Sequence, residues 1–196
     1  MKVYDVDSGE RINTVSTGGL FRADEMAIGD KGRALLVVNN ADAPAFMTLI
    51  STKPGNAILF SHVTVPGATG GIEQPVWARG TKRFYISVPQ LNDSPTDGGV
   101  AVFNPKTGMV EQVFHVPGCQ PNGIALGPHQ HLLLGCANRS GPTTASSTIT
   151  NAKDGTIVAT IPQVGASDEV WFNRGDERYY LAARQNPAAQ GGRRWA

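Results

Sequence analysis

The amino-acid sequence predicts an all-β fold, a β-propeller built from four-stranded antiparallel blades. One four-part pattern recurs along the 196 residues at a spacing of roughly 46–50 residues, which is typical of blade-built proteins and of solenoids. Each part is a short apolar run bounded by turn residues, as expected of strands. No segment shows a convincing apolar period of 3.6 residues, so we expect no helix, and helical solenoids are excluded.

The first half of each repeat predicts a hairpin. It opens on a polar residue or proline that leads into apolar residues, at 24–28, 74–78, 121–126 and 168–172. Polar or glycine-bearing turns follow at 29–32, 79–82, 127–130 and 174–177, and short apolar runs come next at 34–38, 84–88, 132–134 and 179–181. These runs have the length of strands and are too short for core helices.

The second half of each repeat predicts another hairpin. Its turns lie at 7–9, 53–55, 105–108 and 153–155, and each contains a glycine that can adopt the positive φ of a tight turn. The flanking strands alternate apolar and other residues, as at Ile157, Ala159 and Ile161. This period of two indicates strands that are buried on one face. One repeat is therefore a four-stranded antiparallel blade.

The phase of the repeat divides the chain into whole and half blades, about four blades' worth in total. We expect a propeller domain over residues 1–187 and an irregular tail over 188–196. The predicted units are a half blade at 1–21, whole blades at 22–71, 72–118 and 119–166, and a half blade at 167–187. In one arrangement the two half blades combine and close a ring without exposed edges. In the other, the chain is a piece of a larger propeller, whose raw edges allow self-association.

Charge and hydropathy exclude several classes of partner. A net charge of +1 and a pI of about 7.8 indicate no electrostatic affinity for nucleic acid or an anionic membrane. The apolar runs are far shorter than the ~20 residues that span a bilayer. Met1 leads directly into a predicted strand, so we expect no signal peptide in this chain, while a periplasmic or secreted parent protein stays open.

The two cysteines lie near one another in the predicted topology. Cys119 precedes the first strand of its blade and Cys136 ends the neighbouring antiparallel strand, so both belong to the same rim. They form either a disulfide or two separate half-buried thiols, and a disulfide would favour an oxidising compartment. Two cysteines without a histidine at matching spacing do not predict a metal site.

In a propeller, the starts of the first strands meet at one mouth of the channel, together with the loops between the second and third strands. The residues predicted there are mostly carboxylates and amides: Asp24, Glu25, Glu73, Gln74, Gln120, Asn122, Asp168 and Glu169 at the strand starts, and Asn39, Asn40, Asp42, Gln90, Asn92, Asp93, Asn138, Arg139, Arg184, Gln185 and Asn186 in the loops. Such oxygen ligands suit Ca²⁺ or Mg²⁺ rather than Zn²⁺. Asp and Asn are also ordinary turn residues. Glu73, Asn122 and Asp168, which occupy equivalent positions facing the mouth, are the candidate metal ligands.

The strand openings at 73–77, 120–125 and 167–172 resemble those of the gluconolactonase, luciferin-regenerating and senescence-marker family, and the segment 99–108 is similar to the repeats of YVTN-type propellers. In the lactonase family one Glu, two Asn and one Asp hold a divalent cation, usually Ca²⁺, and the Asp is the proposed general base for lactone hydrolysis. The resemblance implies metal ligation by Glu73, Asn122 and Asp168, a catalytic role for Asp168, and Asn138 or Asn92 as the second Asn. The family has six blades, and its Glu lies several blades before its Asn, whereas Glu73 lies in the adjacent blade.

Two functions follow as hypotheses. The first is a propeller scaffold without catalysis, which binds a small molecule, an ion or a protein at its mouth, with the loop at 89–99 as a contact surface. The alternative is a divalent-metal-dependent lactonase, in which a Ca²⁺-like ion polarises a lactone carbonyl and Asp168 orients or deprotonates water.

The histidines, serines and tryptophans are weaker candidates for functional residues. His62 and His115 fall on predicted outer strands and His129 and His131 on a turn away from the mouth, so none is placed beside a mouth carboxylate. Ser146, Ser147 and Ser167 have no nearby histidine, which leaves a Ser-His-Asp triad unsupported. Trp77 and Trp171 recur at equivalent positions of the first strand, and we expect both to pack between blades.

Overall fold

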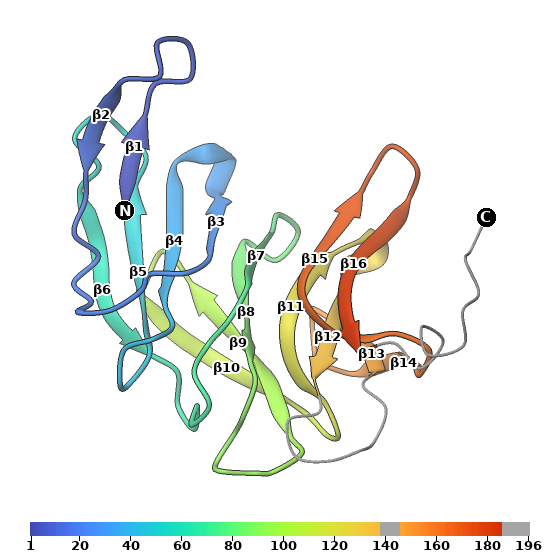
Figure 1. Cartoon of the computed structure of the whole chain (residues 1–196). Coiled ribbons are helices and arrows are strands. Elements are labelled where there is room, and N and C mark those ends of the chain that lie inside the picture. Colours follow the sequence, from blue (N-terminus) through green and yellow to red (C-terminus); the bar gives the residue numbers. More distant parts are fainter. Residues whose placement is uncertain (138–145, 186–196) are drawn as a thin grey trace.

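The computed structural model describes residues 1–137 and 146–185, which form sixteen β-strands and two short 3₁₀ turns (Figure 1). The strands make three four-stranded and two two-stranded antiparallel sheets, so the predicted all-β class is confirmed. In this part of the chain the only helical turns are η1 (Asp30–Gly32) and η2 (Pro128–Gln130). Neither turn is long and apolar enough to cross a bilayer.

The three four-stranded sheets follow the chain in order, each built from consecutive strands joined as hairpins. The first sheet contains β3 (Met26–Gly29), β4 (Ala34–Asn39), β5 (Phe46–Ser51) and β6 (Ile58–Thr64). The second contains β7 (Pro75–Ala78), β8 (Arg83–Val88), β9 (Gly98–Asn104) and β10 (Met109–Val116). The third contains β11 (Gln120–Leu126), β12 (His131–Ala137), β13 (Ser146–Asn151) and β14 (Ile157–Ile161).

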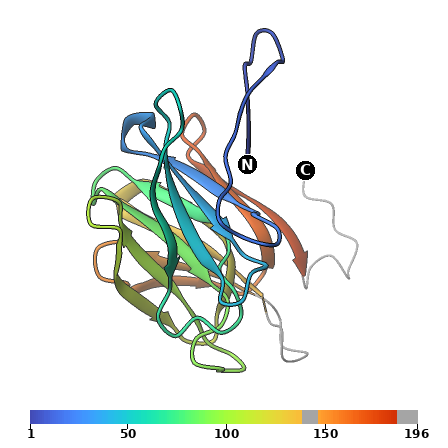
Figure 2. The same cartoon turned by 90° about the vertical axis from the view of Figure 1, so that its left-hand side faces the viewer.

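Two-stranded sheets stand at the two ends of this series. One pairs β1 (Lys2–Tyr4) with β2 (Arg11–Thr14), and the other pairs β15 (Gly165–Asn173) with β16 (Arg178–Gln185). The β1–β2 hairpin projects beyond the neighbouring sheets (Figure 2). No described strand of one terminal pair bonds to the other pair, so the arrangement in which the half blades combine and close a ring is not the one adopted.

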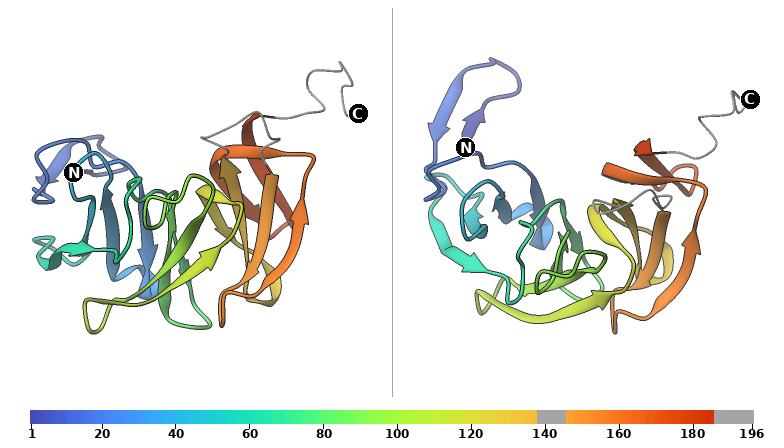
Figure 3. Two further views of the ribbon diagram at one scale, coloured as in Figure 1. Left: turned by 90° about the horizontal axis from the view of Figure 1, so that it is seen from below. Right: turned by 60° about the horizontal axis from the view of Figure 1, so that its bottom comes forward.

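The sheets succeed one another around an open arc, with β3, β7, β11 and β15 on its inner side (Figure 3). These four strands contact one another in that order. The middle strands are buried on both faces because a neighbouring sheet covers each side; β4 and β9, for example, are buried along their whole lengths. The outer strand β14 is mostly exposed. Burial therefore decreases from the middle strands towards the outside.

Side chains fill the spaces between adjacent sheets. Leu36 and Met47 of the first sheet pack with Phe84 and Phe103 of the second in one core. A second core joins the second and third sheets, where the Tyr85 hydroxyl donates a 2.6 Å hydrogen bond to the carbonyl of Ala152. Burying aromatic and branched side chains in this way is the main source of stability in sheet-on-sheet packing.

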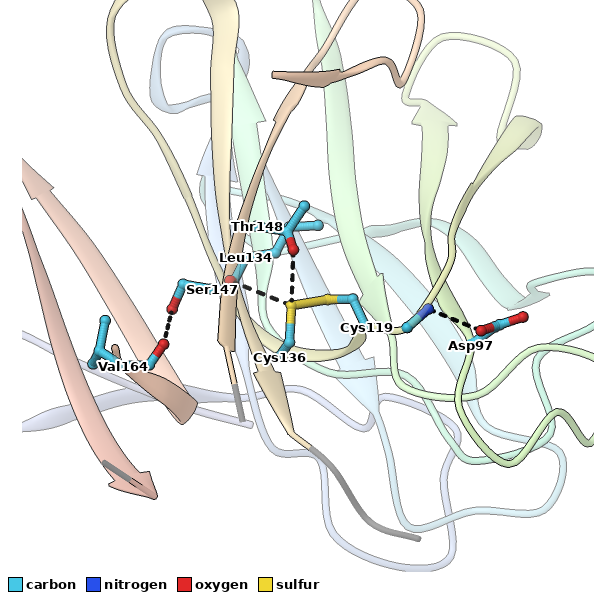
Figure 4. Close-up of a disulfide and its surroundings, with 8 residues drawn as sticks. Asp97, Cys119, Leu134, Cys136, Ser147, Thr148 and Val164 are labelled. Carbon is cyan, nitrogen blue, oxygen red and sulfur yellow. Dashed lines mark hydrogen bonds between the residues drawn. A yellow bond between two sulfur atoms is a disulfide. The ribbon is translucent and has the colours of Figure 1, made fainter. Parts of the chain in front are cut away.

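A disulfide joins Cys119, just before β11, to Cys136 near the end of β12, with a Cα–Cα distance of 4.9 Å (Figure 4). Of the two alternatives that the sequence leaves open, the bridge is therefore correct. The adjacent turn is held as well, because Gly118 donates its backbone N–H to Asp97 Oδ1 at 2.9 Å. His115 Nε2 lies 3.3 Å from Asp97 Oδ2, so this histidine does meet a carboxylate, although Asp97 does not line the acidic cavity described below.

Candidate functional site

A cavity of about 290 Å³ opens where the inner strands begin, and five carboxylates line it. Its lining residues are Arg22, Asp24, Glu25, Glu73, Asn122, Asp168 and Glu169. They come from the segments that precede β3 and β7 and from β11 and β15, so four sheets contribute. The three residues predicted as metal ligands, Glu73, Asn122 and Asp168, therefore share one cavity.

Backbone hydrogen bonds fix the two segments that precede their strands. The Asp24 N–H donates to the Val38 carbonyl, and the Val38 N–H donates to the Glu25 carbonyl, both at 2.9 Å. In the second sheet, the Glu73 N–H bonds to the Ser87 carbonyl at 2.9 Å in the same way. These bonds extend the β3–β4 and β7–β8 ladders beyond the regular strands. The acidic residues are thus held at fixed positions on the sheets and not on loose loops.

Irregular pairing places the contributions of the other two sheets. The register shifts between Pro121 and Gly123 in β11, at Asn122, and between Ser167 and Val170 in β15, at Asp168 and Glu169. A bulge of this kind re-aims a side chain relative to the regular alternation of a strand. The two bulges lie at equivalent places in neighbouring sheets. This explains why residues 46 positions apart in the chain meet.

Asn122 holds the carboxylate of Asp168. Its Nδ2 donates a 2.8 Å hydrogen bond to Asp168 Oδ1, and the asparagine itself is only 4% exposed. A buried donor with one orientation fixes the direction of the carboxylate that it contacts. Asp168 is therefore a positioned carboxylate.

Gln74 performs a similar task for Glu169 and also ties three sheets together. Its Nε2 donates to Glu169 Oε2 at 2.9 Å. Its Oε1 accepts backbone N–H groups from Ile124 at 2.7 Å and from Val170 at 3.2 Å. One side chain next to β7 thus satisfies groups on β11 and β15. The sequence placed Gln74 at the mouth, but this bridging role was not predicted.

Glu25 is the carboxylate with the least favourable surroundings. Burial raises its pKa to about 9, and the nearby carboxylates Glu169, Glu73, Asp24 and Asp168 add to the increase. Its Oε2 is buried and has no hydrogen-bond partner within the described ranges. The pKa of Glu169 is also raised, first by burial and then by Asp168 and Asp24. The cavity concentrates negative charge that needs a proton or a cation.

The one arginine of the lining gives limited compensation. Arg22 Nη2 lies 2.7 Å from Asp24 Oδ2, and the arginine side chain is 65% exposed. An ion pair so open to solvent contributes little. It also contacts Asp24 and not Glu25, so the buried carboxylate keeps its unfavourable environment.

The oxygen positions fit a calcium-sized ion. One carboxylate oxygen each from Asp24, Glu25 and Glu73 can be chosen so that all three lie within 4.8 Å of one another. Ca²⁺ binds oxygens at about 2.3–2.6 Å, so ligands on opposite sides of an ion lie about 5 Å apart. Glu25 Oε2, which is buried and unpartnered within the described residues, is an oxygen suited to such an ion. The lining therefore fits a hard divalent cation.

The closest oxygen group differs from the predicted ligand set. Glu73 belongs to both, and its partners in the group of close carboxylates are Asp24 and Glu25 and not Asp168. Asp24 and Glu25 stand at the strand opening equivalent to Glu73, which is the signal that could have singled them out. Asp168 and Asn122 lie in the same cavity as a hydrogen-bonded pair.

Other predicted mouth residues have different roles. Asn92 lines a separate cavity with Gly67, so it does not supply a second asparagine here, and Asn138 falls outside the described residues. Asn39 is fully buried and accepts a 2.6 Å hydrogen bond from the Thr17 hydroxyl. The remaining outlying candidates, Arg139 and Asn186, are also outside the described ranges.

The two tryptophans behave differently. Trp77 packs against Phe84 with ring centroids 4.7 Å apart, as expected for a residue between sheets. Trp171 is 55% exposed, so the expectation that it packs between blades was wrong. It lies in the last sheet of the described chain, where no further described sheet covers it.

Comparison with known proteins supports the fold only. No protein-family model and no curated protein matches the chain. Among solved structures, hydrazine synthase of Kuenenia stuttgartiensis is similar, with a TM-score of 0.72 and 12% identity over 90% of this chain. The match covers 47% of that chain, so the sequence spans about half of its length.

Proposed function

We propose that the chain is a β-propeller scaffold that binds a hard divalent cation, Ca²⁺ foremost, in the acidic cavity at the start of its inner strands. Its four-stranded antiparallel sheets, arranged in chain order with their first strands in contact, support the assignment of these sheets as blades. The half blades at the two ends would then pair with further strands. A second copy of the chain could supply these strands, so self-association remains a prediction.

The observation that carries the proposal is Glu25. A carboxylate with a buried, unpartnered oxygen and four acidic neighbours is unfavourable when charged, which its raised pKa reflects. One proton would neutralise Glu25 alone. A divalent cation within reach of Asp24, Glu25 and Glu73 would neutralise the group together, at oxygen spacings that suit Ca²⁺.

Lactone hydrolysis is the second candidate function, because the cavity also contains a positioned carboxylate. A bound cation would supply Lewis acidity towards a carbonyl oxygen. Asp168, oriented by Asn122, would hold a water molecule and accept its proton. The small, polar cavity of about 290 Å³ would admit a small substrate.

Thermal unfolding of chelator-treated protein tests the cation site. We expect millimolar Ca²⁺ to raise the melting temperature by several degrees, since a ligand at a hundredfold excess over its Kd stabilises the folded state by about 2.7 kcal/mol. Glu25→Gln should remove most of the shift. Glu10→Gln, a change at an exposed carboxylate in the β1–β2 turn, should leave it intact. No shift with Ca²⁺, Mg²⁺ or Mn²⁺ would rule out the proposed site.

A lactone panel separates the two functions. If the chain is a lactonase, Asp168→Asn should abolish hydrolysis while the Ca²⁺-dependent rise in melting temperature persists in reduced form. A wild-type protein that binds Ca²⁺ but hydrolyses none of the lactones supports the scaffold function.

A further inference from the structure

A second cavity, of about 480 Å³, lies between the first and second sheets at the opposite ends of β3 and β7 from the acidic cavity. Its lining combines apolar and basic residues: Arg33, Ala34, Leu49, Ser51, Lys53, Ala57, Leu59, Trp77, Lys82, Pro105 and Lys106. Both flanking sheets are described along their whole lengths. The cavity therefore does not depend on strands beyond either end of the chain.

The apolar part of the lining is rigid. Leu49 is 1% exposed and belongs to the core between the sheets. The indole of Trp77 is braced by Phe84 at an interplanar angle of 57°. Gly29 allows this approach, since a Cβ there would lie 2.8 Å from the Trp77 ring. The indole of Trp77 is thus a fixed apolar surface beside an open space, and the half-exposed side chain of Leu59 borders the same space.

The basic part of the lining comes from separate turns. Lys53 lies between β5 and β6, Lys82 between β7 and β8, and Lys106 between β9 and β10, while Arg33 precedes β4. Among the described residues no carboxylate lines this cavity. The three lysine ammonium groups make no hydrogen bond or ion pair within the described part of the chain.

This accumulation of charge is local. The whole chain has a net charge of only +1, yet four cationic side chains surround one cavity. The three lysine ammonium groups have no counter-charge within the described residues, so they repel one another, and an anion placed among them relieves the repulsion. Because these cationic side chains also border an apolar surface, the ligand that fits best combines negative charge with an apolar group.

We propose that this cavity binds a small organic polyanion, with a flat apolar body against Trp77 and Leu59 and with carboxylate, phosphate or sulfonate groups facing Lys53, Lys82 and Lys106. The volume of about 480 Å³ lies within the range of small-molecule sites. Arginine and lysine recognise anionic oxygens, and aromatic faces accept flat apolar groups. The site shares no lining residue with the acidic cavity.

Fluorescence anisotropy of pyrene-1,3,6,8-tetrasulfonate, an aromatic polyanion, provides the test. We expect saturable binding that weakens as salt rises, because exposed cations contribute to it. The double variant Lys53→Gln/Lys106→Gln should bind about tenfold more weakly, as expected for the loss of two solvent-exposed charge contacts. The matched variant Lys31→Gln/Lys153→Gln removes the same charge from turns outside the cavity and should bind within about twofold of wild type.

Two results would overturn the proposal. Equal weakening in both double variants would show that the probe responds only to net charge. Displacement of the probe by inorganic sulfate at concentrations similar to those of unlabelled pyrenetetrasulfonate would show that the apolar surface contributes nothing. Both lysine pairs lie in turns, so we expect both double variants to fold. Circular dichroism of each variant checks this before binding is compared.

Discussion

Gln74 donates a 2.9 Å hydrogen bond from its side-chain amide to Glu169, although 95 residues separate them in the chain. The same amide accepts the backbone N–H groups of Ile124 and Val170 through its oxygen. A single side chain therefore links three consecutive sheets at the wall of the acidic cavity, and stability and site geometry depend on the same contacts.

Replacing Gln74 with alanine should destabilise the fold by about 2–4 kcal/mol, because two part-buried N–H groups lose their acceptor. Urea denaturation measures the loss. Gln163→Ala, an exposed change just before β15, should alter the free energy of unfolding by less than about 0.5 kcal/mol. Equal stability of the two variants would contradict the bridging role of Gln74.

Stability should depend on pH through Glu25, whose pKa is raised to about 9 from an unfolded value near 4.5. Above pH 4.5 the unfolded state loses this proton while the folded state retains it, so stability falls as pH rises towards 9. With a chelator present, we expect the free energy of unfolding to fall by about 1–2 kcal/mol between pH 5 and pH 8. This is less than the full pKa difference implies, because the cavity is partly open to solvent.

Glu25→Gln provides the comparison for this pH dependence. The amide cannot ionise, so the variant should lose most of the decline and exceed wild type in stability at pH 8 without Ca²⁺. Denaturant titrations at a series of pH values measure this. If the variant and the wild type show parallel pH profiles, Glu25 is not the group responsible.

Asn122→Ala should weaken Ca²⁺ binding by about tenfold, since Asp168 loses the donor that orients it in the cavity. Calorimetric titration with Ca²⁺ measures the affinity. Asn173→Ala, at the far end of β15, serves as the control and should leave the affinity unchanged. An unaltered affinity in Asn122→Ala would place Asp168 outside the cation environment.

Removing the disulfide should destabilise the chain by about 3 kcal/mol, because the bridge closes a loop between residues 17 positions apart and so restricts the unfolded state. The double variant Cys119→Ala/Cys136→Ala should unfold at lower urea concentration than wild type, and a reductant should not alter it further. Reductant-insensitive stability of the wild type would argue against the bridge in solution. Disulfides of this kind are typical of proteins in oxidising compartments.

The strand pattern could be predicted from the sequence because the turns are chemically marked. Gly9, Gly55, Gly108 and Gly155 all adopt positive φ in the second hairpins, as the turn positions require. The alternation in the intervening strands then determines which face is buried. The separation of the terminal strand pairs could not be predicted, because both arrangements satisfy the same repeat phase.

The acidic cavity could be predicted in part. Equivalent positions in successive repeats identify Glu73, Asn122 and Asp168 as neighbours. Asp24 and Glu25 stand at the equivalent opening of the first sheet and were placed at the mouth, but which carboxylates lie closest to Glu73 depends on how the sheets pack. The basic cavity was not foreseen, since its lysines come from turns that are ordinary when each is considered alone.

The order of the sheets along the arc also determines where local unfolding begins. The principal strand contacts run from each sheet to the next between β3 and β16, whereas the β1–β2 pair is linked to the first sheet by Val15 and by the hydrogen bond from Asn13 to Asn56. In linear arrays of this kind, local opening begins at the ends and proceeds inwards. Amide protons of β8, β9 and β12 should therefore exchange most slowly. Those of β1 and β2 should exchange first, long before the chain as a whole unfolds.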